Sequence, residues 1–274
     1  MNHFVCVGPG RSGTSWLYEV LREQKEVCLA QNVKETEFFN TNYQKGLLWY
    51  KNFFNYCGGA VIAGEISNRY IFDKSVAGKI FDFDHNCKII ICMRNPYHRL
   101  QSVYSFKLRE GALNCSFSQA LKKMPELRSE MEYHPFVEQY YNTFRRDNIF
   151  ILNFDRIESD PEGLMKDLFC FLGLKNIYPS KVANRKVNRA IVPRVDFFGG
   201  FVKNIAITLR YFKLFKILTA LKRSDFVKSI FFKECNYKDE KLLDKIDAEL
   251  KISLNSDLEK MQKLTGDSYS HWML

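Results

Sequence analysis

Short apolar runs alternate along this chain with segments in which apolar residues recur at helical spacing. The runs at residues 4–7, 60–65 and 88–93 are short, and the last contains three consecutive isoleucines. Runs of this kind are typical of strands that are buried on both faces of a parallel sheet. Their alternation with helical segments predicts an α/β fold, in which a parallel sheet is flanked by helices on both faces.

The remaining expected elements follow from the same periodicity and from turn residues. Asp160, Pro161 and Gly173 bracket one helix, because proline suits the first helical turn and glycine suits the residue after the last. Further strands are expected at residues 27–30 and 149–152, and helices from residue 14 onward and at residues 47–54, 70–81, 96–108, 134–146, 164–172 and 239–264.

A basic region interrupts this alternation between residues 197 and 233. Apolar residues recur there at helical spacing, with lysines and arginines between them, which predicts a basic amphipathic helical region. Two uses of it stay open. The pattern favours a helical subdomain packed on the core, and the alternative is an element that contacts a membrane surface or an acceptor.

The charge balance points to an anionic partner without choosing one. The chain has 274 residues and a net charge of +10, which suits an anionic ligand, polymer or membrane. No uncharged apolar run reaches about 18 residues, so no membrane span is expected. The first strand begins near residue 3 or 4, which leaves no room for a signal peptide.

The eight cysteines show no metal-binding spacing. None of them forms a C-x-x-C pair, which argues against a zinc site. Cys6 and Cys92 stand inside apolar strand runs, where a free cysteine behaves as a small hydrophobic residue. We therefore expect reduced thiols, and with them a cytoplasmic location.

A glycine-rich turn joins the first predicted strand to the first predicted helix at residues 8–13. Its backbone N–H groups and the positive end of the helix form the usual cradle for phosphate. The spacing of Gly8 and Gly13 matches the start of a P-loop, but Thr14 stands where the P-loop lysine should be. The cation comes earlier, at Arg11, which points to phosphate binding without magnesium-dependent NTP hydrolysis. A purely structural turn is the weaker alternative.

Two further strand ends carry candidate chemistry. Arg94 follows the strongest strand and Ser102 lies about two helical turns later, so both can face one anion, although a surface ion pair explains Arg94 equally well. Glu65 ends another strand, where partial desolvation suits a general base. A helix cap or an ion pair with Lys34 or Arg69 stays open for Glu65.

Together these stretches resemble the sulfotransferases that use 3′-phosphoadenosine-5′-phosphosulfate (PAPS). Residues 8–17 resemble the loop that holds the 5′-phosphosulfate, and residues 94–102 resemble the 3′-phosphate motif. Residues 34–39 and 64–70 resemble the Lys-Glu-x-x-x-Phe and Glu-x-Ser-x-x-Tyr stretches of carbohydrate sulfotransferases. The resemblance extends to the helix near residue 174 and to the tail, and so covers most of residues 3–190 plus the end of the chain.

This resemblance implies a site and a domain plan. Glu65 would be the acceptor base, with Arg11 and Lys34 beside the transferred group. The implied domain is a single one of residues 1–274, with a P-loop-like nucleotide-binding core at 1–190 and a helical acceptor-side region at 191–274. The residues implied for nucleotide binding are Arg11, Ser12, Gly13, Thr14, Ser15, Trp16, Arg94, Ser102, Lys186 and Asn188.

The implied reaction is an in-line displacement from PAPS, with 3′,5′-ADP as the product and no metal. The implied acceptor is a hydroxyl or amine of a glycan, a lipid-linked molecule or a small molecule. Peripheral contact with the inner membrane face through basic helices at 201–233 is a further expectation, and no nucleic-acid partner is expected. The alternatives are a P-loop nucleotide kinase or other nucleotide-binding protein, and a non-catalytic basic module.

Overall fold

The computed structural model describes residues 2–176, 180, 191–193, 232–234 and 240–274. The chain divides into two compact units, each of which is described by itself. The first unit comprises Met1–Asn95, Glu132–Asn188 and Leu254–Leu274, and the second comprises Pro96–Met131 and Arg189–Ser253. Each unit is assembled from segments that lie far apart in the sequence. Neither unit therefore follows the expected division at residue 190. The single domain stays a prediction.

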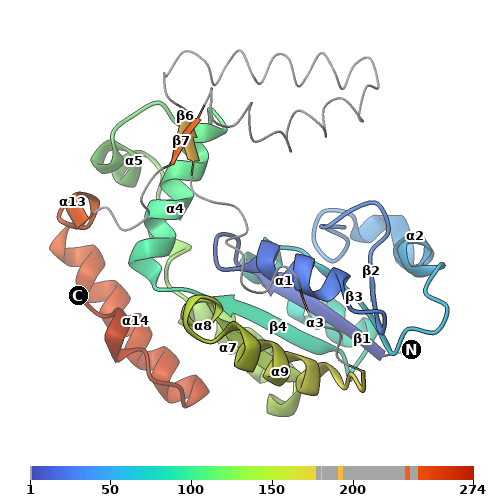
Figure 1. The fold of residues 1–274 in the computed structure, drawn as a ribbon. Coiled ribbons are helices and arrows are strands. Elements are labelled where there is room, and N and C mark those ends of the chain that lie inside the picture. Colours follow the sequence, from blue (N-terminus) through green and yellow to red (C-terminus); the bar gives the residue numbers. More distant parts are fainter. Residues whose placement is uncertain (1, 177–179, 181–190, 194–231, 235–239) are drawn as a thin grey trace, which may run out of the picture. The chain divides into compact units, whose positions relative to one another are not determined.

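The first unit is built on a five-stranded sheet of order β2-β3-β1-β4-β5, in which every neighbouring pair is parallel (Figure 1). All five expected strands are confirmed, with ends that differ by a few residues. They are β1 (Asn2–Gly8), β2 (Val27–Leu29), β3 (Ile62–Ile66), β4 (Lys88–Met93) and β5 (Ile149–Asn153).

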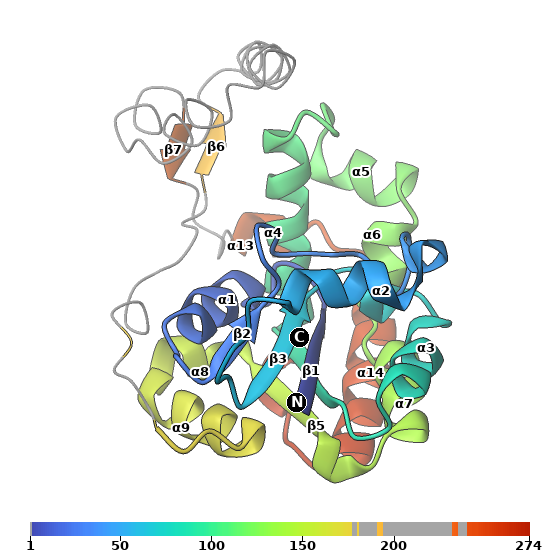
Figure 2. The same ribbon diagram turned by 90° about the vertical axis from the view of Figure 1, so that its right-hand side faces the viewer.

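One face of the sheet is covered by α1 (Thr14–Arg22), α8 (Phe154–Ser159) and α9 (Pro161–Leu172), which lie on its left in Figure 2. Phe4 and Cys6 of β1 are buried on this face. The apolar stripe expected for the first helix packs here as well. All four of its residues, Trp16, Leu17, Val20 and Leu21, are buried in the same cluster.

The other face carries α3 (Val76–Phe83), α7 (His134–Thr143) and the end of α14 (Ala248–Thr265), on the right of the sheet in Figure 2. Val5 and Val7 of β1 are buried on this face, because successive strand residues point to opposite sides. The expected α/β fold with helices on both faces is therefore confirmed. A short helix, α2 (Gly46–Lys51), follows the 3₁₀ turn η1 (Tyr43–Lys45) and precedes η2 (Asn52–Phe54).

Two expected helices are each broken in two. The helix expected at 70–81 consists of η3 (Tyr70–Phe72) and α3, because the Asp73 carboxylate accepts hydrogen bonds from Ser75 N and Oγ at 2.9 and 2.7 Å. Such a local bond offers the backbone an alternative to the helix. The helix expected at 239–264 begins as α13 (Glu240–Leu243) and restarts where the carboxylate of Asp247 accepts from the N–H of Leu250.

The second unit contains α4 (Pro96–Arg109), α5 (Phe117–Lys123) and α6 (Glu126–Ser129). It also contains an antiparallel pair, β6 (Ile191–Pro193) and β7 (Phe232–Glu234). The helix expected from residue 96 onward is confirmed as α4. Within this unit the Arg128 guanidinium pairs with the carboxylate of Asp247 at 2.6 Å.

Most of the expected basic helical region lies outside the described residues, namely residues 197–231. Its last two residues, Phe232 and Lys233, belong to β7, so the prediction of a helix is wrong at that end. Pairing with β6, a partner about forty residues away, sets the strand conformation there. No helix within the described ranges is long and apolar enough to cross a membrane.

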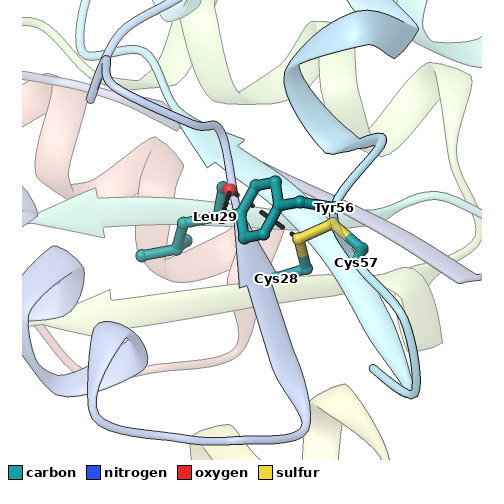
Figure 3. The surroundings of a disulfide bond; sticks show 4 residues. All are labelled: Cys28, Leu29, Tyr56 and Cys57. Carbon is teal, nitrogen blue, oxygen red and sulfur yellow. Dashed lines mark hydrogen bonds between the residues drawn. A yellow bond between two sulfur atoms is a disulfide. The ribbon is translucent and has the colours of Figure 1, made fainter.

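The expected reduced thiols are found at Cys6 and Cys92, which are free and buried, but two other cysteines are oxidised. Cys28 of β2 and Cys57 form a disulfide, with their Cα atoms 5.7 Å apart (Figure 3). Beside it the Tyr56 hydroxyl donates to the carbonyl oxygen of Leu29 at 2.5 Å. The fold creates this proximity across 29 residues of sequence, and the cytoplasmic prediction thereby loses the support of uniformly reduced thiols.

Candidate functional site

The glycine-rich turn leaves β1 at Gly8 and enters α1 after Gly13. Gly8, Arg11 and Gly13 adopt left-handed φ values of 100°, 68° and 102°. A Cβ at Gly8 would collide with the carbonyl oxygen of Asn68, and one at Gly13 would lie 2.6 Å from Ile157 Cδ1. The turn therefore requires glycine at both ends, because only glycine combines this φ with such close approach.

The N-terminus of α1 lacks the usual cap. Gly13 is the N-cap residue, it offers no side-chain hydrogen bond, and the first turn contains no acidic residue. Ser12 next to it is fully buried, and its Oγ has no hydrogen-bond partner within the described part of the chain. A buried hydroxyl is normally satisfied. The helix end thus presents N–H groups and an unused hydroxyl, which is a setting for an anion.

Lys34 brings a second positive charge to this helix end. Its ammonium donates to Thr14 Oγ1 at 3.4 Å and to Ser15 Oγ at 3.5 Å. Lys34 stands between β2 and η1, 20 residues after Thr14. The structure therefore unites two parts of the expected site that the sequence could only place on separate segments.

Arg94 also reaches the turn. It follows β4, and its Nη1 donates to the carbonyl oxygen of Arg11 at 3.1 Å. Its guanidinium lies 4.3 Å from the ring centroid of Phe154, and Tyr133 OH donates to its carbonyl oxygen at 2.7 Å. These contacts hold Arg94 at the turn. Ser102 lies on α4 in the second unit, so the expectation that both residues face one anion stays a prediction.

Glu65 is the most enclosed carboxylate of the site. It lies on β3 and is 1% exposed. Its Oε2 accepts from Thr36 N, Thr36 Oγ1 and Ser67 Oγ at 3.1, 2.6 and 2.6 Å, and its Oε1 accepts from Tyr70 OH at 3.0 Å. Burial raises the pKa of Glu65, although the bonds from Ser67 and Thr36 oppose the shift. All four bonds come from uncharged donors, so none of them is the ion pair with Lys34 or Arg69 that the sequence left open.

Glu35 is a second carboxylate that the sequence interpretation did not single out. Its Oε1 lies 3.7 Å from Lys34 Nζ and accepts from Asn68 Nδ2 at 2.6 Å. Its side chain is 28% exposed, and partial burial raises its pKa while the neighbouring Lys34 opposes the shift. Its place directly after Lys34 in the Lys-Glu stretch was the signal that could have identified it.

The remaining predicted residues divide into three groups. Thr14 and Ser15 lie at the helix end as expected. Trp16 does not face the turn with its side chain, which is 3% exposed and packs in the core against the sheet, so only its backbone is available to a ligand there. Lys186 and Asn188 lie outside the described residues. Within the described ranges, no group of three His, Cys, Asp or Glu residues could hold a metal ion.

The arrangement fits the 5′-phosphosulfate end of PAPS. The donor set is cationic and rich in N–H and hydroxyl groups, which is what a phosphate or sulfate oxygen requires. The Ser12 hydroxyl has no hydrogen-bond partner among the described residues, so it is available to such an oxygen. In the described part of the chain, neither the cap residue nor the first turn of α1 supplies a carboxylate that would compete with such a ligand.

Comparison with known proteins agrees with this chemistry. Residues 1–191 match the family model described as a sulfotransferase domain. The bifunctional heparan sulfate N-deacetylase/N-sulfotransferase 1 of Xenopus laevis is 25% identical over 201 residues, which covers 63% of this chain and 22% of that protein. The heparan sulfate glucosamine 3-O-sulfotransferase 3B1 of Mus musculus is 25% identical over 186 residues, or 65% of this chain and 47% of that protein. The chain thus spans less than half the length of these relatives.

A solved structure shares the fold. The crystal structure of a sulfotransferase from Alicyclobacillus acidocaldarius superposes with a TM-score of 0.69 at 18% identity, covering 99% of this chain and 98% of the other. At that identity the similarity establishes the fold alone. It agrees with the parallel sheet and the P-loop-like turn described above.

Proposed function

The chain belongs to the sulfotransferase family, and we propose that it transfers a sulfuryl group from PAPS to a hydroxyl or amine of a glycan-class acceptor. When bound, PAPS supplies the sulfuryl group and leaves as 3′,5′-ADP. The proposal needs no metal, because Arg11, Lys34 and the N–H groups of the turn provide the positive charge that an outgoing phosphate oxygen requires.

One observation carries the proposal. The N-terminus of α1 has no side-chain cap, the buried Ser12 hydroxyl has no partner in the described part of the chain, and the Lys34 ammonium lies against Thr14 and Ser15. An uncapped, positively charged helix end beside a second cation suits a phosphosulfate group. Lysine at position 14, which an NTP-hydrolysing loop would use, is absent.

The remaining nucleotide contacts follow from the resemblance. We propose Arg94 and Ser102 for the 3′-phosphate, and Lys186 and Asn188 for the loop that covers the nucleotide. The bond from Arg94 Nη1 to the Arg11 carbonyl oxygen holds the Arg94 guanidinium beside the 8–13 turn, and so near the place proposed for the nucleotide.

Two carboxylates compete for the role of base. Glu65 is the candidate from sequence, but its burial and its bonds to protein donors leave it no surface for an acceptor. Glu35 is partly exposed, lies beside Lys34 and has a pKa raised by burial, which improves a carboxylate as a proton acceptor near neutral pH. We therefore assign proton removal from the acceptor to Glu35, and Glu65→Gln tests the earlier candidate.

The acceptor class rests on the relatives, whose names specify heparan sulfate. A polysaccharide acceptor also suits the net charge of +10. Lipid-linked and small-molecule acceptors belong in the same screen. The cytoplasmic location and the membrane contact of residues 201–233 are kept as predictions, and no nucleic-acid partner is proposed.

Thermal denaturation with nucleotides tests the donor. We expect 3′,5′-ADP to raise the melting temperature more than 5′-AMP does, because Arg94 and Ser102 are proposed to bind the 3′-phosphate, and ATP with magnesium to have the smallest effect. Stabilisation by ATP with magnesium alone would overturn the proposal. Radiolabelled PAPS with N-deacetylated and desulfated heparan polysaccharides then tests transfer, with a lipid-linked glycan and simple phenols as comparison acceptors.

A further inference from the structure

A buried hub connects β3 to the segment that carries Lys34 and Glu35. Its centre is the Glu65 carboxylate, which accepts four hydrogen bonds. Two of these come from Thr36, one from its N–H and one from its hydroxyl. The other two come from the hydroxyls of Ser67 and Tyr70, which follow Glu65 in the chain.

The hub holds more than one residue of the segment. Thr36 Oγ1 also accepts from the N–H of Phe38 at 3.1 Å, and Tyr70 OH accepts from the N–H of Phe39 at 3.1 Å. Asn42 Nδ2 donates to the carbonyl oxygen of Thr36 at 2.9 Å. The backbone N–H groups of Thr36, Phe38 and Phe39 therefore donate to side chains of the hub, where a helix or strand would supply backbone partners.

Such anchoring matters because the segment has no regular structure of its own. No helix or strand lies between β2 and η1. Lys34 and Glu35 lie within this stretch, and Thr36, which the hub anchors, follows them directly. Hydrogen bonds to an ionised carboxylate are among the stronger ones in proteins, so the hub is suited to fix the backbone on which both side chains stand.

We propose that Glu65 is a positioning residue, which holds Thr36 and thereby sets Lys34 and Glu35 against the N-terminus of α1. The inference rests on the proposed sulfuryl transfer. Glu65 takes no proton from the acceptor and touches neither donor nor acceptor. Its burial and its saturation by protein donors are the features that a positioning carboxylate has and a general base lacks.

Glutamine is the informative substitution. In Glu65→Gln the amide oxygen can replace Oε2 and accept from Thr36 and Ser67. The amide NH₂ can replace Oε1 and donate to Tyr70, because a tyrosine hydroxyl accepts as well as donates. The hub therefore survives in E65Q but not in Glu65→Ala, while a proton acceptor is lost in both. Glu35→Gln is the matched variant, since it removes a carboxylate and leaves the hub intact.

The test compares kcat, KM and 3′,5′-ADP affinity across these variants. We expect E65Q to stay within about tenfold of the wild-type kcat, and E65A to lose about 100-fold, as small misplacements of reacting groups do. Affinity for 3′,5′-ADP should match wild type in E65Q and fall together with kcat in E65A, because Lys34 is then no longer held against Thr14 and Ser15. E35Q should lose about 100-fold or more in kcat while binding 3′,5′-ADP normally.

Amide hydrogen exchange of residues 34–39 provides a readout that needs no turnover. E65A should exchange faster than wild type there, and E65Q should match wild type. If E65A does not fold, Thr36→Val removes the hydroxyl bond and Thr36→Ser restores it, with the same pattern expected in kcat and in exchange.

Two results would overturn the inference. One is an E65Q protein that is folded, binds 3′,5′-ADP and is as inactive as E65A, since Glu65 would then be the base. The other is wild-type exchange and kcat in E65A. Wild-type protein that transfers nothing from PAPS to any acceptor, yet shows the expected exchange pattern, would instead refute the proposed function and leave the hub itself established.

Discussion

Two helices of the first unit, α1 and α9, begin in opposite ways. At α9 the Asp160 carboxylate accepts from the N–H of Gly163 at 3.0 Å, Pro161 occupies the first turn and Glu162 adds negative charge. At α1 the N-cap is Gly13, without a side-chain bond and without an acidic residue in the first turn. One helix end is closed by the protein's own carboxylate, and the other has no side-chain cap and no acidic residue in its first turn.

The difference between the two N-termini separates a helix end that is stabilised by the protein itself from one that is not. Both helices pack on the same face of the sheet, so their burial does not distinguish them. A carboxylate at a helix N-terminus neutralises the partial positive charge there and stabilises the helix. The α1 end forgoes that stabilisation and gathers Ser12 and Lys34 instead, which is consistent with selection for anion binding.

The largest expected effect is on 3′,5′-ADP affinity, and it should follow when the N-terminus of α1 is given a carboxylate like that of α9. Thr14→Asp places a carboxylate in the first turn of α1, where an anionic donor is proposed to bind. We expect 3′,5′-ADP to bind at least about 100-fold more weakly, because like charges in contact cost several kcal/mol. The free protein should keep or raise its melting temperature, because a carboxylate in the first turn stabilises a helix. Isothermal titration and thermal denaturation measure both, and Thr14→Asn is the uncharged control. Unchanged affinity in T14D would refute an anion site at this end.

Removing the second cation should have the next largest effect. Lys34→Met keeps the length of the side chain and loses its charge and its bonds to Thr14 and Ser15. We expect kcat to fall by about 100-fold, the size of effect seen when one charge-stabilising group is lost from an active site. Steady-state kinetics with PAPS would measure it, and Lys45→Met, on an exposed residue of η1, is the control. A wild-type kcat in K34M would exclude Lys34 from the site.

Removing the unpartnered hydroxyl should have a smaller effect. Ser12→Ala eliminates one buried hydroxyl that forms no hydrogen bond with any residue the structure describes. We expect 3′,5′-ADP affinity to fall about tenfold, because one hydrogen bond to a charged group contributes about 1.5 kcal/mol. The free protein should be as stable as wild type or slightly more so. A loss of stability without a loss of affinity would show that Ser12 serves the fold.

The smallest effect on 3′,5′-ADP affinity should come from the opposite change, which removes the carboxylate at the N-terminus of α9. Asp160→Ala removes its cap, and we expect a small decrease in melting temperature with 3′,5′-ADP affinity unchanged. The bond from Arg156, followed by the Gly163 N–H, lowers the pKa of Asp160 in the folded protein. Its contribution is therefore present at neutral pH and is lost as the pH falls through that lowered value. The difference between D160A and wild type should shrink in acid, and a constant difference would contradict this origin.

Local signals in the sequence were sufficient to predict most of the longer helices and the strands of the parallel sheet. Apolar strand runs predicted all five strands of the parallel sheet but not β6 and β7, and the Asp160, Pro161 and Gly173 signals predicted α9, whose C-cap Gly173 has a φ of 75°. Two helix breaks were missed although their cause is local, since Asp73 and Asp247 each bond to a backbone N–H two or three residues later. Those signals were present in the sequence and were outweighed by the apolar periodicity around them.

The sequence by itself determined the fold class, the family resemblance and the glycine-rich turn between β1 and α1, because each depends on spacing within a short segment. Only the tertiary structure decided which residues meet across the sheet. The strand order β2-β3-β1 brings together segments separated by tens of residues, and with them Lys34 and Thr14, Glu65 and Thr36, and the Cys28–Cys57 disulfide. The tertiary structure also determined which side chains are buried, and it buried Glu65 at the end of β3 among four hydrogen-bond donors. Spacing along a chain cannot reveal such contacts, because strand order and register determine which residues are neighbours.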